Sequence, residues 1–252
     1  MTAAQYVYAI GRELDPAALA ALAGLAGIDG AAVGQIAHRH VIAIASAAPS
    51  DETALRARLE RLDELATLAK AHEAVVAAVA ALTVIAPLRL ATIYQNEQRV
   101  HQMLRHRHDE FDALLDRLAG MVEVGVKLYL DNLSPDRAAP SSSGRAYLQQ
   151  LSQRHQRRDE DWRNAAAAVQ RIDTALAAHA LDRSHHRPQP AQLSGAAGHN
   201  VLNAAYLIPN RRVTEFAELA QRLATQQPNI HVEVTGPWAP YSFATPDTGD
   251  RS

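Results

Sequence analysis

Apolar and smaller residues alternate at the start of the chain, and this period of two predicts an opening strand over residues 5–10. An Asp-Pro pair follows at residues 15–16, with the aspartate suited to a helix cap and the proline to the first helical position. Residues 33–46 contain two further strand-like runs, which fit one bent strand or a hairpin equally well. The chain is therefore expected to begin with a strand, a helix and more strand.

Apolar residues then recur at spacings of three and four from about residue 51, which predicts the main packing helix of a first domain. The repeat consists of Leu55, Leu59, Leu62, Leu65, Leu68, His72, Val75 and Val79. Residues 83–94 are expected to be extended, because Pro87 lacks a backbone donor and disfavours helix in the residue before it. The order β-α-β-β-α-β predicts a ferredoxin-like α+β domain over residues 1–95.

Residues 96–252 are predicted to form a second α+β domain built around a long polar helix. Its elements are expected to be a helix, a strand, the long helix, a strand, a helix and a strand, at residues 97–119, 122–130, about 145–181, 201–208, 214–225 and 230–235. Two segments rich in serine, proline or glycine, residues 131–144 and 182–200, are expected to be mobile loops. The whole chain is thus predicted to be a two-domain α+β protein.

Composition narrows the possible partners. Lys and Arg total 25 against 27 for Asp and Glu, so no field of one sign attracts nucleic acid, and no nucleic-acid partner is expected. The longest nearly uncharged run, residues 74–86, is shorter than the roughly 20 residues that span a bilayer, so no membrane partner is expected either. The chain has no cysteine and its first residues lack the pattern of a secretory signal, which favours a cytoplasmic location.

The motifs predict no catalytic, cofactor or metal site. Four glycines between residues 24 and 34 precede a strand, whereas a phosphate-binding loop needs them between a strand and a helix. His38 and His40 share one face of a strand but have no third ligand nearby in the sequence, so they are interpreted as surface histidines. His72 lies on an apolar helix stripe and is interpreted as a satisfied, semi-buried histidine. Since no Gly-x-Ser-x-Gly motif occurs either, the protein is predicted to be non-enzymatic.

The long helix carries the candidate binding residues. Arginines and acids are interleaved over residues 154–163, which indicates either ion pairs within the helix or a protein-binding face. Because arginine and aromatic residues dominate interface hot spots, the partner-binding candidates are Tyr147, Arg154, Arg158 and Trp162. The edge of the N-terminal sheet is the alternative surface, where a partner segment could add as a strand.

Five segments, taken in chain order, resemble the gas vesicle F/L family. They are Tyr6-Val7-Tyr8-Ala9-Ile10, His72-Glu73 leading to Pro87-Leu88-Arg89-Leu90-Ala91-Thr92, Gly144-Arg145-Ala146-Tyr147-Leu148, Asn203-Ala204-Ala205-Tyr206-Leu207 and Gly236-Pro237-Trp238-Ala239-Pro240-Tyr241-Ser242-Phe243. The last is the most specific, because it is similar to the family's Gly-Pro-Trp-Pro-Pro-Tyr-Ser-Phe ending. Ala239 replaces a proline of that ending, and Leu90-Ala91 replace Phe-Gly, which changes backbone freedom more than polarity.

The resemblance implies a non-enzymatic accessory protein for gas vesicle formation. Such a protein is expected to bind the hydrophobic shell protein, other gas vesicle accessory proteins or both during assembly, without a cofactor. It is expected to be cytoplasmic and associated with gas vesicles. The alternative is a small-ligand-binding regulatory protein or an enzyme on a ferredoxin-like scaffold, because a fold does not fix a function.

The residues that carry the resemblance are expected to have structural roles before binding ones. They are Pro87, Arg89, Gly144, Tyr147, Gly236, Pro237, Trp238, Tyr241 and Phe243. The prolines of residues 236–243 restrict the backbone, and the aromatic side chains supply apolar area in a chain with only 5% aromatic residues. This closing segment is therefore expected to stabilise the fold and to hold the two domains together.

Overall fold

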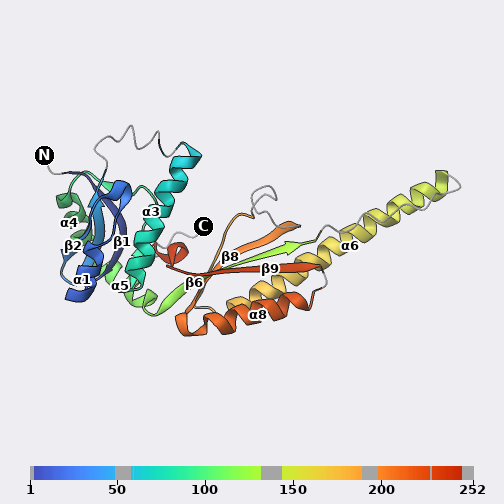
Figure 1. The fold of residues 1–252 in the computed structure, drawn as a ribbon. Helices are drawn as coiled ribbons and strands as arrows, with labels where there is room; N and C mark the ends of the chain where they lie inside the picture. Colours follow the sequence, from blue (N-terminus) through green and yellow to red (C-terminus); the bar gives the residue numbers. More distant parts are fainter. Residues whose placement is uncertain are drawn as a thin grey trace. The chain divides into compact units, whose positions relative to one another are not determined.

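The computed structural model describes residues 3–48, 58, 60–131, 144–188, 198–227 and 229–245 (Figure 1). Its elements form a mixed α+β protein with two antiparallel sheets, so the predicted class is confirmed. The chain divides into two compact units, Met1–Glu123 together with Trp238–Ser252, and Val124–Pro237. This division differs from the expected boundary between residues 95 and 96, because two helices after that boundary pack on the first sheet.

The sheet of the first unit has the strand order β2-β3-β1-β4, and β5 also pairs with β1. The strands are β1 (Gln5–Arg12), β2 (Val33–His38), β3 (Val41–Ala47), β4 (Ile85–Pro87) and β5 (Ile93–Tyr94). β2 and β3 are antiparallel, with His38 paired to Val41, so the two strand-like runs form a hairpin rather than one bent strand. Arg39, in the turn between them, has a positive φ of 55°.

Four helices of the first unit pack against this sheet: α1 (Pro16–Ala23), α3 (Leu62–Ala80), α4 (Glu97–His106) and α5 (His108–Leu118). The core that α1 and α3 share with the sheet contains Tyr6, Tyr8, Leu22, Ile42, Ile44, Leu68, Val75, Val76 and Val79. α4 and α5 contact the same strands and bury apolar side chains of their own, such as Leu104 and Leu115. As a result, every residue of β1 from Tyr6 to Gly11 is buried.

The helix predicted over residues 97–119 is broken in the structure. Arg107 separates α4 from α5 with φ −112° and ψ 20°, which is not helical geometry. Its guanidinium lies 4.7 Å from the centre of the Phe111 ring, and its Nε donates to Glu110 at 2.8 Å. Because both helices bury their apolar positions, the periodicity of the sequence does not reveal the break.

The sheet of the second unit has the strand order β7-β8-β6-β9. Its strands are β6 (Met121–Leu130, which begins in the first unit), β7 (Asp182–His185), β8 (His199–Pro209) and β9 (Ile230–Trp238). Two helices, α6 (Gly144–Ala177) and α8 (Val213–Thr225), lie side by side along the sheet (Figure 1). Ile172 and Leu176 of α6 are buried, and the Tyr206 and Phe216 rings pack with centroids 5.3 Å apart.

Part of the loop expected over residues 182–200 is a strand. Asp182–His185 form β7, which pairs antiparallel with β8 from Leu207 to Ala204. The polar sequence of this short edge strand lacks the apolar alternation that would have identified it. Residues 189–197, and residues 132–143 of the other expected loop, lie outside the described residues. The long helix ends at Ala177, four residues before the expected end.

Candidate binding site

All four partner-binding candidates lie on α6, but only one of their side chains is described. Tyr147, Arg154 and Arg158 are helical, and their side chains lie outside the described part of the structure. The Trp162 side chain is 39% exposed, and its ring centroid lies 6.2 Å from that of His199 at the start of β8. Trp162 therefore lies next to the second sheet, six residues before Ala168, which is the first buried residue among the described side chains of α6.

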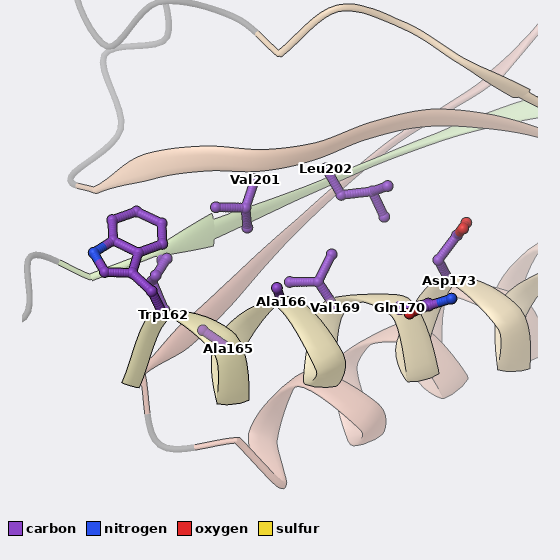
Figure 2. A pocket seen from close by; sticks show the side chains of 9 residues that line it. Trp162, Ala165, Ala166, Val169, Gln170, Asp173, Val201 and Leu202 are labelled. Carbon is purple, nitrogen blue, oxygen red and sulfur yellow. The ribbon is translucent and has the colours of Figure 1, made fainter. Parts of the chain in front are cut away.

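Trp162 lines a pocket between α6 and the second sheet (Figure 2). The pocket has a volume of about 350 Å³, and most of its lining is aliphatic. Val201 and Leu202 of β8 form one wall, and Ala166 and Val169 of α6 lie across from them (Figure 2). The amphipathic pattern of α6 explains this arrangement, because the apolar positions that face the sheet are small near Trp162 and larger further along the helix.

Among the described residues that line the pocket, Asp173 carries the one buried carboxylate, and it lies at the end opposite Trp162 (Figure 2). Its Oδ2 accepts a hydrogen bond from Arg183 Nη1 at 2.6 Å and lies 3.0 Å from His185 Nε2. Its Oδ1 accepts a hydrogen bond from the Tyr206 hydroxyl at 2.6 Å. Burial, and then the bond to Asp173, raise the pKa of the Tyr206 hydroxyl well above its ordinary value. The charge of this acid is thus balanced within the second unit.

Asp173 and its partners belong to none of the motifs that mark candidate residues in the sequence. A signal was available, because Asp173 shares an apolar stripe with Val169, Ile172 and Leu176, and an acid at a buried helix position needs partners. Those partners come from β7 and β8, and nothing in the spacing along the chain shows which side chains they are.

The closing segment, residues 236–243, joins the first unit from Trp238 onward. The Tyr241 hydroxyl donates to Glu73 Oε2 of α3 at 2.9 Å, and the Ser242 backbone N–H donates to a carboxylate oxygen of Glu123 at 2.7 Å. Phe243 is buried, whereas Trp238 is 48% exposed. Gly236 has a φ of 107°, which favours glycine, and Pro237 is exposed. These two residues therefore shape the backbone before Trp238 and do not contribute side chains to the core.

The remaining residues of the family-like segments differ in their surroundings. Pro87 is buried in β4 and pairs with Ala9 of β1. Arg89 is exposed, and its carbonyl accepts from the Thr92 backbone N–H at 3.2 Å. Gly144 is the first residue of α6.

A buried cluster of polar rings lies under α3 in the first unit. His72 is 3% exposed, and its Nδ1 lies 2.9 Å from the Tyr6 hydroxyl, which also accepts from the Ala91 backbone N–H at 2.9 Å. The Tyr8 hydroxyl lies 2.8 Å from Ser46 Oγ. Burial raises the pKa of Tyr6 to about 12 and lowers the pKa of His72. His72 is therefore fully buried rather than semi-buried as expected, and it is hydrogen-bonded through Nδ1.

Three histidines gather at the turn between β2 and β3. The His108 ring lies 5.6 Å from His38 and 4.9 Å from His40, centroid to centroid. His40 Nε2 lies 2.7 Å from Asp112 Oδ1, and Asp112 also pairs with Arg12. Desolvation, followed by neighbouring cations, lowers the pKa of His38. Within the described ranges, no three His, Cys, Asp or Glu side chains are arranged to hold a metal ion.

The two antiparallel sheets with their packed helices define a mixed α+β protein, and its second unit carries an aliphatic pocket beside an exposed tryptophan. In the described part of the chain, no helix combines the length and the apolar character needed to cross a bilayer. The chain belongs to the gas vesicle synthesis protein GvpL/GvpF family, whose model matches residues 4–245, and this confirms the F/L resemblance. The family is one of gas vesicle accessory proteins and is not a known enzyme family.

Known proteins that are similar to this chain are also gas vesicle proteins. Gas vesicle protein L of Streptomyces sp. (strain CB03234) is 42% identical over 250 residues, which cover 95% of this chain and 92% of that protein. The crystal structure of GvpF from Anabaena sp. PCC7120 matches with a TM-score of 0.65 at 19% identity, over 97% of both chains. The crystal structure of GvpF from Microcystis aeruginosa matches with a TM-score of 0.64 at 22% identity, over 97% of this chain and all of the other. The two crystal structures support the fold.

Proposed function

We propose that this chain is a non-enzymatic accessory protein that binds the hydrophobic shell protein, other gas vesicle accessory proteins or both during assembly. The observation that carries the proposal is the exposed Trp162 beside an aliphatic pocket, in a member of a gas vesicle family. A shell that excludes water needs subunits with large apolar faces, and such faces aggregate unless they are covered before assembly. A binder with an apolar site suits that task.

The interface is proposed to lie on α6, around Tyr147, Arg154, Arg158 and Trp162. Tryptophan, tyrosine and arginine dominate interface hot spots, and the exposure of Trp162 supports this choice. The second candidate surface is β2, which is an edge strand of the first sheet and could pair with an extended partner segment.

A pull-down with purified shell protein tests the proposed interface. Changing Trp162 and Arg158 together to Ala should weaken capture by about tenfold or more, because hot-spot truncations typically cost over 1 kcal/mol each. Circular dichroism and the melting temperature should stay near those of the wild type. The matched control changes Leu181 and Arg222 to Ala, since these side chains are 59% and 61% exposed in the same unit and lie away from the pocket. Equal capture by both double variants would remove α6 from the interface.

Cross-link mapping of the captured complex distinguishes the two surfaces. Cross-links along α6 would favour the helix, and cross-links confined to β2 and its neighbours would favour the sheet edge. A wild-type protein that captures no shell protein would shift the proposal to a partner among the other accessory proteins.

We also infer that the first unit is a ferredoxin-like module and that the protein works in the cytoplasm at gas vesicles. The element order from β1 to β4 and the antiparallel strand order β2-β3-β1-β4 support the ferredoxin-like assignment. The absence of cysteine and the family support the location. Fluorescent tagging in a gas vesicle-forming host tests it, since signal outside the vesicle-containing regions would contradict it.

A further inference from the structure

We propose that the pocket between α6 and β8 receives uncharged aliphatic side chains from a segment of a protein partner, with Trp162 packing over them. The inference rests on the proposed function and deepens it, because it names the chemistry of the partner segment and the place where it binds. Three features of the pocket support the inference: its aliphatic lining, its charge balance and the exposed Trp162 side chain at one end.

The lining favours an apolar occupant. Aliphatic side chains from three elements face the pocket, among them Leu130 of β6, Val169 of α6 and Leu202 of β8. The volume of about 350 Å³ would hold roughly a dozen water molecules at about 30 Å³ each. Water in such a pocket finds few hydrogen-bond partners, so an aliphatic group that replaces it gains free energy. The volume also lies within the range of about 300–1,000 Å³ that is usual for ligand-binding pockets.

The charge balance of the pocket selects an uncharged occupant. Of the described lining residues, Asp173 is the one with a charged side chain, and Arg183, His185 and Tyr206 already surround its two oxygens. A lysine entering the pocket would find that acid already paired, and an entering carboxylate would find no free donor of positive charge on the lining. Either charged group would lose its hydration without compensation. Gln170 adds one neutral amide, which suits a backbone group of the partner.

The mouth of the pocket carries a large, rigid aromatic side chain. Trp162 is 39% exposed although it adjoins the buried part of α6, and its ring centroid lies 6.2 Å from that of His199. An aromatic side chain placed this way contributes a large contact area when a partner covers it. Ala165 and Ala166 follow it on the helix, and their small size leaves the space that the partner would fill (Figure 2).

The test fills the pocket from its own wall. Ala166→Leu adds an aliphatic side chain at a lining position of α6, and Ala167→Leu makes the same change at the next residue, which is exposed and does not line the pocket. Both variants are made in the full chain, together with Trp238→Phe, which leaves Trp162 as the only tryptophan of the two. Circular dichroism and melting of each variant verify that the fold is kept.

Two blocked synthetic peptides serve as probes. One has a central Val-Leu-Val-Leu run, and the other has Ser-Lys-Ser-Glu in its place. The aliphatic peptide should shift Trp162 emission to shorter wavelength in a saturable way, and the charged peptide should not. Ala166→Leu should weaken this binding by about tenfold or more, whereas Ala167→Leu should change it less than about twofold. Equal binding of the aliphatic peptide by both variants, or equal binding of the two peptides, would overturn the proposal.

Capture of the shell protein separates this inference from the proposed function. If Ala166→Leu loses both the peptide and the shell protein while Ala167→Leu keeps both, the pocket is the anchor for the partner. If Ala166→Leu loses the peptide but captures shell protein normally, the inference is overturned and the proposed function stands. If the wild type binds the aliphatic peptide in the pocket but captures no gas vesicle protein, the proposed function fails and the pocket chemistry holds. Sedimentation velocity adds one more outcome, since a dimer lost in Ala166→Leu would assign the pocket to a second copy and overturn the inference.

Discussion

The buried acid on α6 gives the sharpest quantitative prediction, and a double-mutant cycle measures it. The perturbations are Tyr206→Phe, Asp173→Ala and the two together. Tyr206 is 0% exposed, and its hydroxyl donates to Asp173 Oδ1 at 2.6 Å, which is a short hydrogen bond to a charged acceptor. Hydrogen bonds to charged groups contribute about 1.5–3 kcal/mol, so Tyr206→Phe should lower the free energy of unfolding by about 2 kcal/mol.

Asp173→Ala should cost more than the loss of one hydrogen bond. It leaves the buried Tyr206 hydroxyl without an acceptor, and it also removes the partner of Arg183, whose side chain is 33% exposed. Leaving a buried group unpaired costs about 1–3 kcal/mol, and losing one member of a buried ion pair costs about 3–5 kcal/mol in total. Because Arg183 is partly hydrated, we expect a loss of about 3 kcal/mol for Asp173→Ala.

The coupling between the two sites is the decisive quantity. In the Tyr206→Phe background, Asp173→Ala should cost about 2 kcal/mol less than in the wild type, because no hydroxyl remains to be left unpaired. That difference is about 30-fold in the unfolding equilibrium constant. Urea unfolding followed by circular dichroism measures all four proteins. Tyr129→Phe is the matched control, since its hydroxyl donates to Glu233, a side chain that is 41% exposed, and its loss should cost less than about 1 kcal/mol. A coupling below about 0.5 kcal/mol would refute the reasoning, because distant sites add to within that amount.

Three further predictions concern the first unit. Truncation after Thr235 should lower the melting temperature, because it removes the hydrogen bond from Tyr241 to α3, and unchanged melting would contradict a structural role for the closing segment. Burial lowers the pKa of His72 from its ordinary 6.5, so the native state takes up a proton less readily than the unfolded chain. The free energy of unfolding should therefore fall as the pH drops below about 6.5. The urea midpoint measures this fall, which should be smaller in His72→Gln. Gly27→Ala should destabilise the protein by about 1–3 kcal/mol, because the added Cβ would lie 2.3 Å from the buried Tyr8 hydroxyl. Gly24→Ala should be near neutral in the same unfolding assay, because the nearest atom to its Cβ lies 3.5 Å away.

The sequence predicts individual helices and strands better than it predicts which of them pack together in one compact unit. Alternation and helical periodicity place β1, β6 and α8 within a few residues. The helix expected from about residue 51 is placed less well, because Arg61 is extended, α3 begins at Leu62, and Leu62 itself is exposed rather than part of the buried stripe. Local pattern does not show which sheet a helix covers, and α4 and α5 pack on the first sheet although they follow the expected boundary between residues 95 and 96. The sequence does not predict β7, because a short edge strand can be polar on both faces.

The candidate site was predictable only in part. Trp162 can be singled out because tryptophan and arginine dominate interface hot spots, and both occur together in this polar part of the helix. The pocket beside it forms from residues of α6, β6 and β8, which meet only after the second sheet has formed. The acid at the other end of the pocket is visible on the helix stripe, but its three partners depend on the register between β7 and β8.

The position of the closing segment at the end of the chain also affects when the first unit can be completed during synthesis. The first unit is built from residues before and after the second unit, so roughly 110 residues separate Glu123 from Trp238. A ribosome that adds about 5–20 residues per second needs roughly 6–22 s to make that intervening stretch. Throughout this interval, the place on α3 that Tyr241 occupies in the finished protein is empty in the nascent chain. The first unit is therefore still incomplete when its N-terminal part has been synthesised, and its hydrogen bond from Tyr241 to α3 forms only after the second unit has been made.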